Sequence, residues 1–195
     1  RVLVDPPPGT ATEQDLIEAE RRGHKLCELV DGVLVEKAMG YSESLLAGLI
    51  LTLLRGFVDP RNLGLVTGPD GLMRLFPGLV RVPDVAFASW ARLPGRRVPK
   101  APCPDLAPDL AVAVLSEGNT ANEMARKRRE YFEAGVRLLW IVDAVARTVT
   151  VFTTADQFQT LSATQALDGG DVLPGFTLAL SKLFADLDRQ GPEET

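Results

Sequence analysis

The stretch from residue 110 to 115, LAVAVL, constrains the fold more than any other part of the chain. An unbroken apolar run of this length is typical of a strand that is covered on both faces at the centre of a sheet. A polar turn at 117–120 follows it, and a helix is then predicted over 119–134, ending at Gly135. A second apolar run at 138–142 predicts another strand. The order of these elements favours a mixed α/β domain with one central sheet and helices packed on it.

Length and charge indicate a single domain and argue against a protein that coats nucleic acid. The chain has 195 residues, 46% of them hydrophobic, which suffices for one well-packed domain spanning 1–195. Residues 1–9 are expected to form an extended, Pro-rich lead-in, and 188–195 a polar tail. The net charge of -5 argues against a protein that coats nucleic acid over its whole surface, although it is compatible with a local basic groove.

No membrane span or secretory segment is predicted. No apolar run reaches the roughly 20 residues that cross a bilayer, and the N-terminal residues lack a secretory apolar core. We therefore expect a cytoplasmic protein without a membrane partner. Cys27 and Cys103 are expected to be buried, reduced thiols. His24 is the single histidine and is expected to lie in a loop or cap, because one histidine cannot build a zinc site.

Shorter elements follow from local signals. Residues 12–15, TEQD, have the pattern of a capping box at the start of a helix that stops at Gly23. Asp-Gly between two alternating runs predicts a hairpin over 25–37, and apolar residues at helical spacing predict a largely buried helix over 42–57. A loop is predicted over 92–108, which holds five prolines and four basic residues. The remaining predicted elements are strands at 63–67, 72–76, 80–88, 148–153 and 157–161, and a closing helix at 180–187.

Two carboxylates stand where Pro-Asp enters an apolar strand. Asp84 opens the strand at 85–88, and Asp109 opens the central strand. A carboxylate at the mouth of a sheet can hold a hard cation such as Mg²⁺, which usually takes one or two protein carboxylates together with waters and phosphate oxygens. For Asp84, a turn-capping role is about equally compatible with the sequence. For Asp109, capping is the better interpretation.

The predicted helix after the central strand carries Glu123, Lys127 and Tyr131 on one face, at four-residue spacing. A lysine that leans toward the sheet can bind a scissile phosphate or orient a nucleophilic water. The same spacing also suits an exposed Glu-Lys ion pair, and the basic run at 126–129 suits a solvated helix face.

Three glutamates are weaker candidates. Glu43 opens the Leu-rich helix, where its carboxylate can reach a sheet edge but is also favoured by the helix dipole alone. Glu36, at the end of the hairpin, is likewise about even between a functional and a purely structural role. For Glu28, the structural interpretation is preferred.

The chain resembles the Uma2 family, also called DUF820, within the PD-(D/E)XK nuclease-like superfamily. The resemblance covers nearly all of the chain and rests on several segments together: 28–32 (ELVDG), 82–85 (VPDV), 108–110 (PDL), 115–116 (LS), 127–136 (KRREYFEAGV), 140–143 (WIVD) and 170–176 (GDVLPGF). It implies a restriction-endonuclease-like central mixed sheet with an N-terminal helix and hairpin. It also implies a catalytic carboxylate at Asp84, a basic catalytic residue at Lys127 and an acidic or histidine residue near Glu43.

The chain departs from this family at one position. The resemblance implies an acidic residue in the central strand, within a Val-Glu-Val-Leu-Ser pattern, and Ala113 stands there. Natural loss of the second metal carboxylate and a deliberate change at codon 113 both fit. The resemblance thus implies a Mg²⁺-dependent endonuclease that hydrolyses DNA phosphodiester bonds and is impaired in this chain. The alternative is a non-catalytic nucleic-acid-binding or scaffolding protein that keeps the fold.

Several expectations follow for ligands and partners. Mg²⁺ or Mn²⁺ should bind weakly, through Asp84, a backbone carbonyl and waters, and Ala113→Glu should raise metal affinity and produce cleavage. Asp84, Ala113 and Lys127 should converge on one cleft. The expected partners are DNA and a second copy of the chain. A positive rim for DNA is expected from basic residues of the long loop and of the following helix: Arg92, Arg96, Arg97, Lys100, Arg126, Lys127, Arg128 and Arg129.

Overall fold

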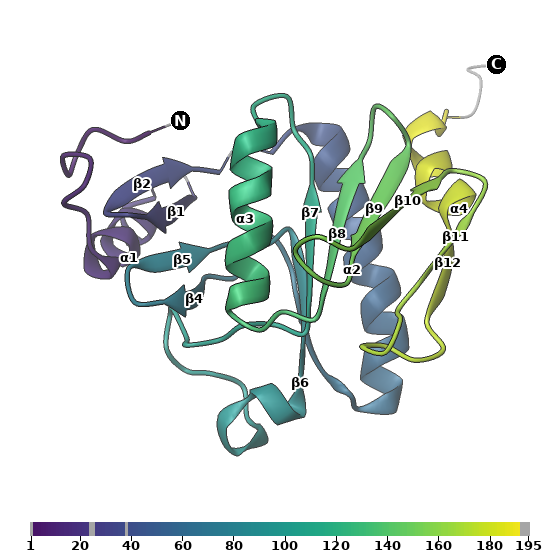
Figure 1. Cartoon of the computed structure of the whole chain (residues 1–195), viewed down its shortest axis with the longest axis horizontal. Helices are drawn as coiled ribbons and strands as arrows, with labels where there is room; N and C mark the ends of the chain where they lie inside the picture. Colours follow the sequence, from purple (N-terminus) through teal and green to yellow (C-terminus); the bar gives the residue numbers. More distant parts are fainter. Residues whose placement is uncertain (1, 24–25, 38, 192–195) are drawn as a thin grey trace.

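A computed structural model describes residues 2–23, 26–37 and 39–191. Two sequence predictions therefore fall partly outside it: the loop position of His24 and the first residue of the hairpin at Lys25. Figure 1 shows a mixed α/β architecture in which one large sheet runs through the middle of the molecule and helices lie on both sides of it. The predicted fold class is confirmed.

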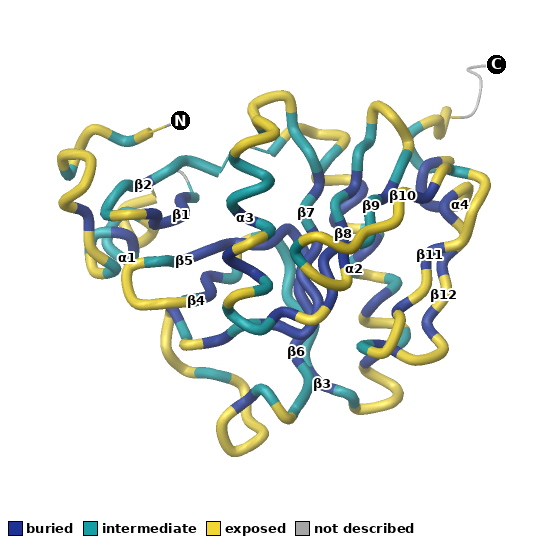
Figure 2. The backbone as a smooth tube through the Cα atoms, viewed as in Figure 1, coloured by how far each residue is buried: buried dark blue, intermediate teal, exposed yellow. Residues whose placement is uncertain are grey.

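The central sheet has six strands in the order β10-β9-β8-β7-β6-β3. Only β7 and β8 run parallel; every other neighbouring pair in this sheet is antiparallel. The strands are β3 (Gly64–Thr67), β6 (Val85–Ser89), β7 (Leu110–Val114), β8 (Leu138–Asp143), β9 (Thr148–Phe152) and β10 (Phe158–Ser162). Four of the five residues of β7 are buried, as the unbroken apolar run predicted, and Figure 2 shows the buried backbone gathered along β6, β7 and β8.

Helices cover the two faces of this sheet. α2 (Tyr41–Arg61) and α4 (Leu180–Ala185) pack with Val85, Val112 and Trp140 in the largest apolar cluster. α3 (Ala121–Glu133) covers the other face, where Tyr131 packs on Ala111 and on residues of β8 and β9. Alternate residues of a strand point to opposite faces, so the residues that flank Val112 point toward α3. Ala111 and Ala113 therefore lie on the face that α3 covers.

A second sheet lies beside the first and has the order β2-β1-β5-β4, all antiparallel. Its strands are β1 (Cys27–Val30), β2 (Val33–Glu36), β4 (Met73–Phe76) and β5 (Leu79–Arg81). α1 (Glu13–Arg21) packs on it, and Thr12 forms the predicted capping box with Asp15. β1 lies between β2 and β5, and all four of its residues are buried, Glu28 included.

Two short strands, β11 (Ala166–Asp168) and β12 (Thr177–Ala179), form a separate ribbon that the sequence did not predict. Three short 3₁₀ turns complete the chain: η1 (Trp90–Arg92), η2 (Pro94–Arg96) and η3 (Asp186–Asp188). η1 and η2 lie at the start of the predicted 92–108 loop. Gly135 ends α3 with a φ of 93°, in the left-handed region, as its position predicted.

One strand prediction was wrong in its extent. The strand expected over 80–88 is two strands, β5 and β6, which lie in different sheets. Residues 82–84 connect them and carry the chain from the small sheet to the large one. Pro83 has no N–H to donate, and the N–H of Val82 donates to the Glu28 carboxylate instead of to a strand. The predicted strands at 63–67 and 72–76 are present as β3 and β4, and they lie in different sheets.

Among the described residues, α2 is long and apolar enough to cross a membrane by length and composition alone. This is weak support for a membrane role, since the core helix of a soluble protein passes the same test. One face of α2 packs in the core, where Leu46, Ile50 and Leu54 are fully buried.

Candidate active site

Asp84 and Ala113 are brought together by two antiparallel strands. The register of β6 and β7 pairs Val85 with Val112, and continuing it by one residue sets Asp84 opposite Ala113. The N–H of Val114 donates to Oδ2 of Asp84 at 2.6 Å, which fixes the carboxylate against β7. Cross-strand partners point to the same face, so both side chains point toward α3.

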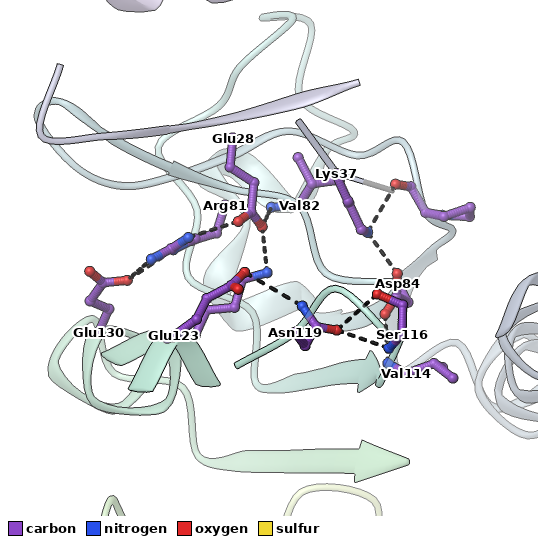
Figure 3. Close-up of polar contacts among 12 residues, drawn as sticks. Glu28, Lys37, Arg81, Val82, Asp84, Val114, Ser116, Asn119, Glu123 and Glu130 are labelled. Atoms are coloured by element: carbon purple, nitrogen blue, oxygen red, sulfur yellow. Dashed lines mark hydrogen bonds and ion pairs between the residues drawn. The ribbon is translucent and has the colours of Figure 1, made fainter. Parts of the chain in front are cut away.

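Lys37 is the cation that reaches Asp84. It follows β2 directly, and its Nζ lies 2.7 Å from Oδ1 of Asp84. The two side chains are only 10% and 6% exposed. The Lys37 ammonium also donates to the Pro69 carbonyl at 3.4 Å. Figure 3 shows Asp84 between these two polar partners, with Lys37 on one side and the Val114 backbone on the other.

Lys127, the predicted catalytic cation, lies on the same side of the sheet but pairs with another carboxylate. Its Nζ is 3.0 Å from Oε1 of Glu28, and its side chain is nearly buried. The helix thus directs Lys127 toward the sheet. Glu123 contacts Asn119 through a 3.5 Å hydrogen bond in the first turn of α3.

Glu28 is the centre of a buried ionic network. Arg81 donates to its Oε2 at 2.7 Å, and the N–H of Val82 donates to its Oε1 at 3.0 Å. Arg81 also pairs with Glu130 of α3. The network continues from Glu130 to Arg126, which reaches Asp31 in the hairpin turn. Figure 3 shows the part of this chain that runs from Glu28 through Arg81 to Glu130.

The environment of Glu28 favours its charged form. Burial by itself would raise the pKa of this carboxyl, but the charges of Lys127 and Arg81 and the Val82 N–H outweigh burial and lower the pKa to about 2. A carboxyl whose pKa is lower in the folded than in the unfolded chain stabilises the fold above the unfolded value of 4.5. That stability is lost as the pH falls from 4.5 toward about 2.

We therefore predict a pH-dependent stability difference between the wild-type chain and Glu28→Gln. The difference in free energy of unfolding should be largest above about pH 4.5 and should shrink as the pH falls, because Gln cannot be protonated. Urea denaturation at a series of pH values from about 6 to about 3 measures it. Parallel pH profiles for the two proteins would contradict the assignment.

The other sequence candidates lie elsewhere. Glu43 folds back over the start of its own helix: a Cβ built on Gly40 would lie 2.2 Å from its Oε2. No hydrogen bond or ion pair between the described residues joins Glu43 to Asp84. Asp109 accepts from the Ser89 N–H and from Arg92 at the opposite end of β7, which is the capping role expected for it.

The basic residues of the predicted rim lie in different environments. Arg126 is engaged with Glu130 and Asp31, and the guanidinium of Arg128 lies over the Phe152 ring, 4.9 Å from its centroid. Arg96 and Arg97 are exposed in the loop that follows β6. The exposed loop residues are therefore more accessible to a phosphate than Arg126 and Arg128 of the helix, which already have partners.

The residues around Asp84 do not fit a divalent cation. Mg²⁺ needs oxygen ligands at about 2.0–2.1 Å, including one or two carboxylates. Here one Asp84 oxygen faces an ammonium and the other accepts from a backbone N–H, and Ala113 offers no ligand. Within residues 2–23, 26–37 and 39–191, no group of three or more His, Cys, Asp and Glu side chains is placed to hold a metal ion.

Comparisons with known proteins agree with this architecture. A crystal structure from Anabaena variabilis ATCC 29413, titled as a "putative nuclease belonging to DUF820", superposes with a TM-score of 0.73. The sequences are 18% identical, and the match covers 82% of this chain and 90% of that one, so the likeness shows a shared fold. No curated protein matches the chain. The family model named Uma2, described as "Putative restriction endonuclease", matches residues 14–181. The chain belongs to the Uma2 family.

Proposed function

We propose that this chain derives from endonucleases that hydrolyse DNA phosphodiester bonds with Mg²⁺, and that its own hydrolysis is impaired. One observation carries the proposal: Ala113 lies opposite Asp84, on the face that α3 covers. A carboxylate at position 113 would stand beside Asp84 as the second anionic metal ligand. Family membership supports a nuclease ancestry, and the alanine accounts for the impairment.

The missing carboxylate affects the binding of the metal ion that would activate the attacking water. A bound divalent cation would lower the pKa of a water and neutralise charge on the phosphate. Without a second carboxylate, Asp84 alone must compete with the Lys37 ammonium for any cation. Binding of Mg²⁺ or Mn²⁺ by the present chain is accordingly weak, and a lysine such as Lys127 has no activated water or bound phosphate on which to act.

A non-catalytic, nucleic-acid-binding or scaffolding role is the second candidate. Ala113 favours it, because a protein that only binds has no need of the second carboxylate. Arg96 and Arg97 are exposed and can meet DNA phosphates, although the net charge of -5 restricts any such surface to a local one. This candidate and the first share the fold and differ in whether restoring the carboxylate restores cleavage.

Cleavage assays on the wild-type chain and on restored variants separate the two. The restored variants are Ala113→Glu alone and Ala113→Glu with Lys37→Met. Supercoiled, linear and single-stranded DNA are incubated with Mg²⁺ or Mn²⁺. We expect at least one restored variant to cleave about 100-fold faster than the wild-type chain. Adding Asp84→Asn to that variant should abolish the gain.

The same proteins are tested for DNA binding by fluorescence anisotropy. Affinity should fall steeply between low and physiological salt, because phosphate contacts release counterions. If no restored variant cleaves any DNA form but salt-sensitive binding is present, the binding role is preferred. If neither cleavage nor binding is found at low salt, DNA is not the partner.

A further inference from the structure

Lys37 and Asp84 form a buried ion pair, which differs in kind from a surface salt bridge. The atoms are 2.7 Å apart and each side chain is at most 10% exposed. A surface pair of this type contributes little and is exchanged readily with solvent ions, whereas a buried charge that loses its partner is strongly unfavourable. Anything that displaces Lys37 from Asp84 must therefore replace the ammonium charge and also supply a new environment for Lys37.

The buried carboxylates on this face of the sheet already have cationic partners. The buried or nearly buried carboxylates are Glu28, Asp84 and Glu130, and the matching cations are Lys37, Arg81 and Lys127. Each carboxylate has a cation within ion-pairing distance. Asp84 is already paired with Lys37, so a divalent cation placed beside it would add two positive charges next to an ammonium.

We infer that the Lys37 ammonium is the resident cation of the Asp84 site, and that Lys37 and Ala113 together exclude divalent metal ions from it. One carboxylate and one ammonium have charges that cancel. In a metal site with the same balance, two carboxylates would face one divalent cation. The inference rests on the proposed function, since it takes Asp84 to be the carboxylate of a former metal site.

The inference changes what Ala113→Glu alone should do. The new carboxylate would lie next to Asp84 and within reach of the same ammonium, so Lys37 would be held by two carboxylates instead of one. The pair would become tighter, and a metal ion would still have to displace Lys37. Metal binding should therefore need both changes, Ala113→Glu to supply the ligand and Lys37→Met to remove the competing cation.

Mn²⁺ is the probe, and the electron paramagnetic resonance signal of the free ion measures its binding. Four proteins are compared: wild type, Lys37→Met, Ala113→Glu and the Lys37→Met/Ala113→Glu double variant. We expect the double variant to bind one Mn²⁺ about 100-fold more tightly than Ala113→Glu alone. The matched control is Lys182→Met/Ala113→Glu, which removes an exposed lysine by the same substitution and should bind no better than Ala113→Glu. Asp84→Asn in the double variant should remove the gain.

Two results would overturn the inference. One is an Ala113→Glu protein that binds Mn²⁺ as tightly as the double variant, which would show that Lys37 does not compete. The other is a folded double variant, checked by circular dichroism, that binds no better than the wild-type chain. DNA cleavage is scored separately, so a protein that gains Mn²⁺ binding without cleavage would support the role of Lys37 while counting against the proposed function.

Amine labelling of the wild-type chain tests the inference even if the double variant fails to fold. Acetylation followed by mass spectrometry should leave Lys37 unlabelled and label the exposed Lys182, with or without millimolar Mn²⁺. Labelling of Lys37 that rises on addition of Mn²⁺ would mean that the metal displaces the ammonium, which contradicts the inference.

Discussion

Replacing Arg81 by Met is expected to lower the free energy of unfolding by about 3–5 kcal/mol. The guanidinium is only 4% exposed and pairs with both Glu28 and Glu130. Met fills a similar volume without the charge, so both carboxylates would stay buried with fewer partners. Lys127 would still neutralise Glu28, and Arg126 would still contact Glu130, which places the effect within this range and not above it.

Urea denaturation followed by tryptophan fluorescence measures the loss. The control is Arg97→Met, the same substitution at an exposed position, which should change stability by less than about 0.5 kcal/mol. A loss below about 1 kcal/mol for Arg81→Met would indicate that the network contributes little to the stability of the fold.

Lys127→Met should reduce DNA cleavage by about 100-fold or more in the most active restored variant, while Mn²⁺ affinity stays unchanged within error. An ammonium acts on the phosphate or on the attacking water, and it does not ligate a cation. Lys127 also pairs with Glu28, so the variant loses some stability as well. The rate is therefore compared well below the melting temperature of both proteins.

Two further variants separate a catalytic from a structural effect. Arg129→Met changes an exposed cation on the same helix and should leave cleavage intact. Lys127→Arg keeps the positive charge and should retain the stability that Met loses. Cleavage that survives Lys127→Met at the parental rate would assign Lys127 to the structural network alone.

Local signals predicted most of the fold. The capping box at Thr12, the Asp31-Gly32 turn and the apolar run of β7 each depend on residues close together in the chain, and each is present in the structure. The two sheets could not be separated from the sequence, because the break at Val82 depends on a hydrogen bond to Glu28, 54 positions earlier.

The same reason limits what could be predicted of the candidate site. The juxtaposition of Asp84 and Ala113 follows from two strands with clear signals and a recognisable family pattern. Lys37 was missed because a lysine at the end of a hairpin is ordinarily solvated, and its partner lies in the other sheet. The sequence favours a structural role for Glu28, but its alternating pattern does not reveal that β1 is an inner strand whose four residues are all buried.

The passage of the chain between the two sheets at residues 82–84 has a consequence for how this family can diverge. Asp84 directly precedes β6 of the large sheet, whereas the lysine beside it directly follows β2 of the small sheet. The two halves of the site thus come from different sheets. A substitution at Lys37 changes the charge beside Asp84 while the central sheet stays the same. Grafting hairpins from relatives onto this sheet, with Glu28 kept because it is buried among Arg81, Val82 and Lys127, would be a direct way to change that charge.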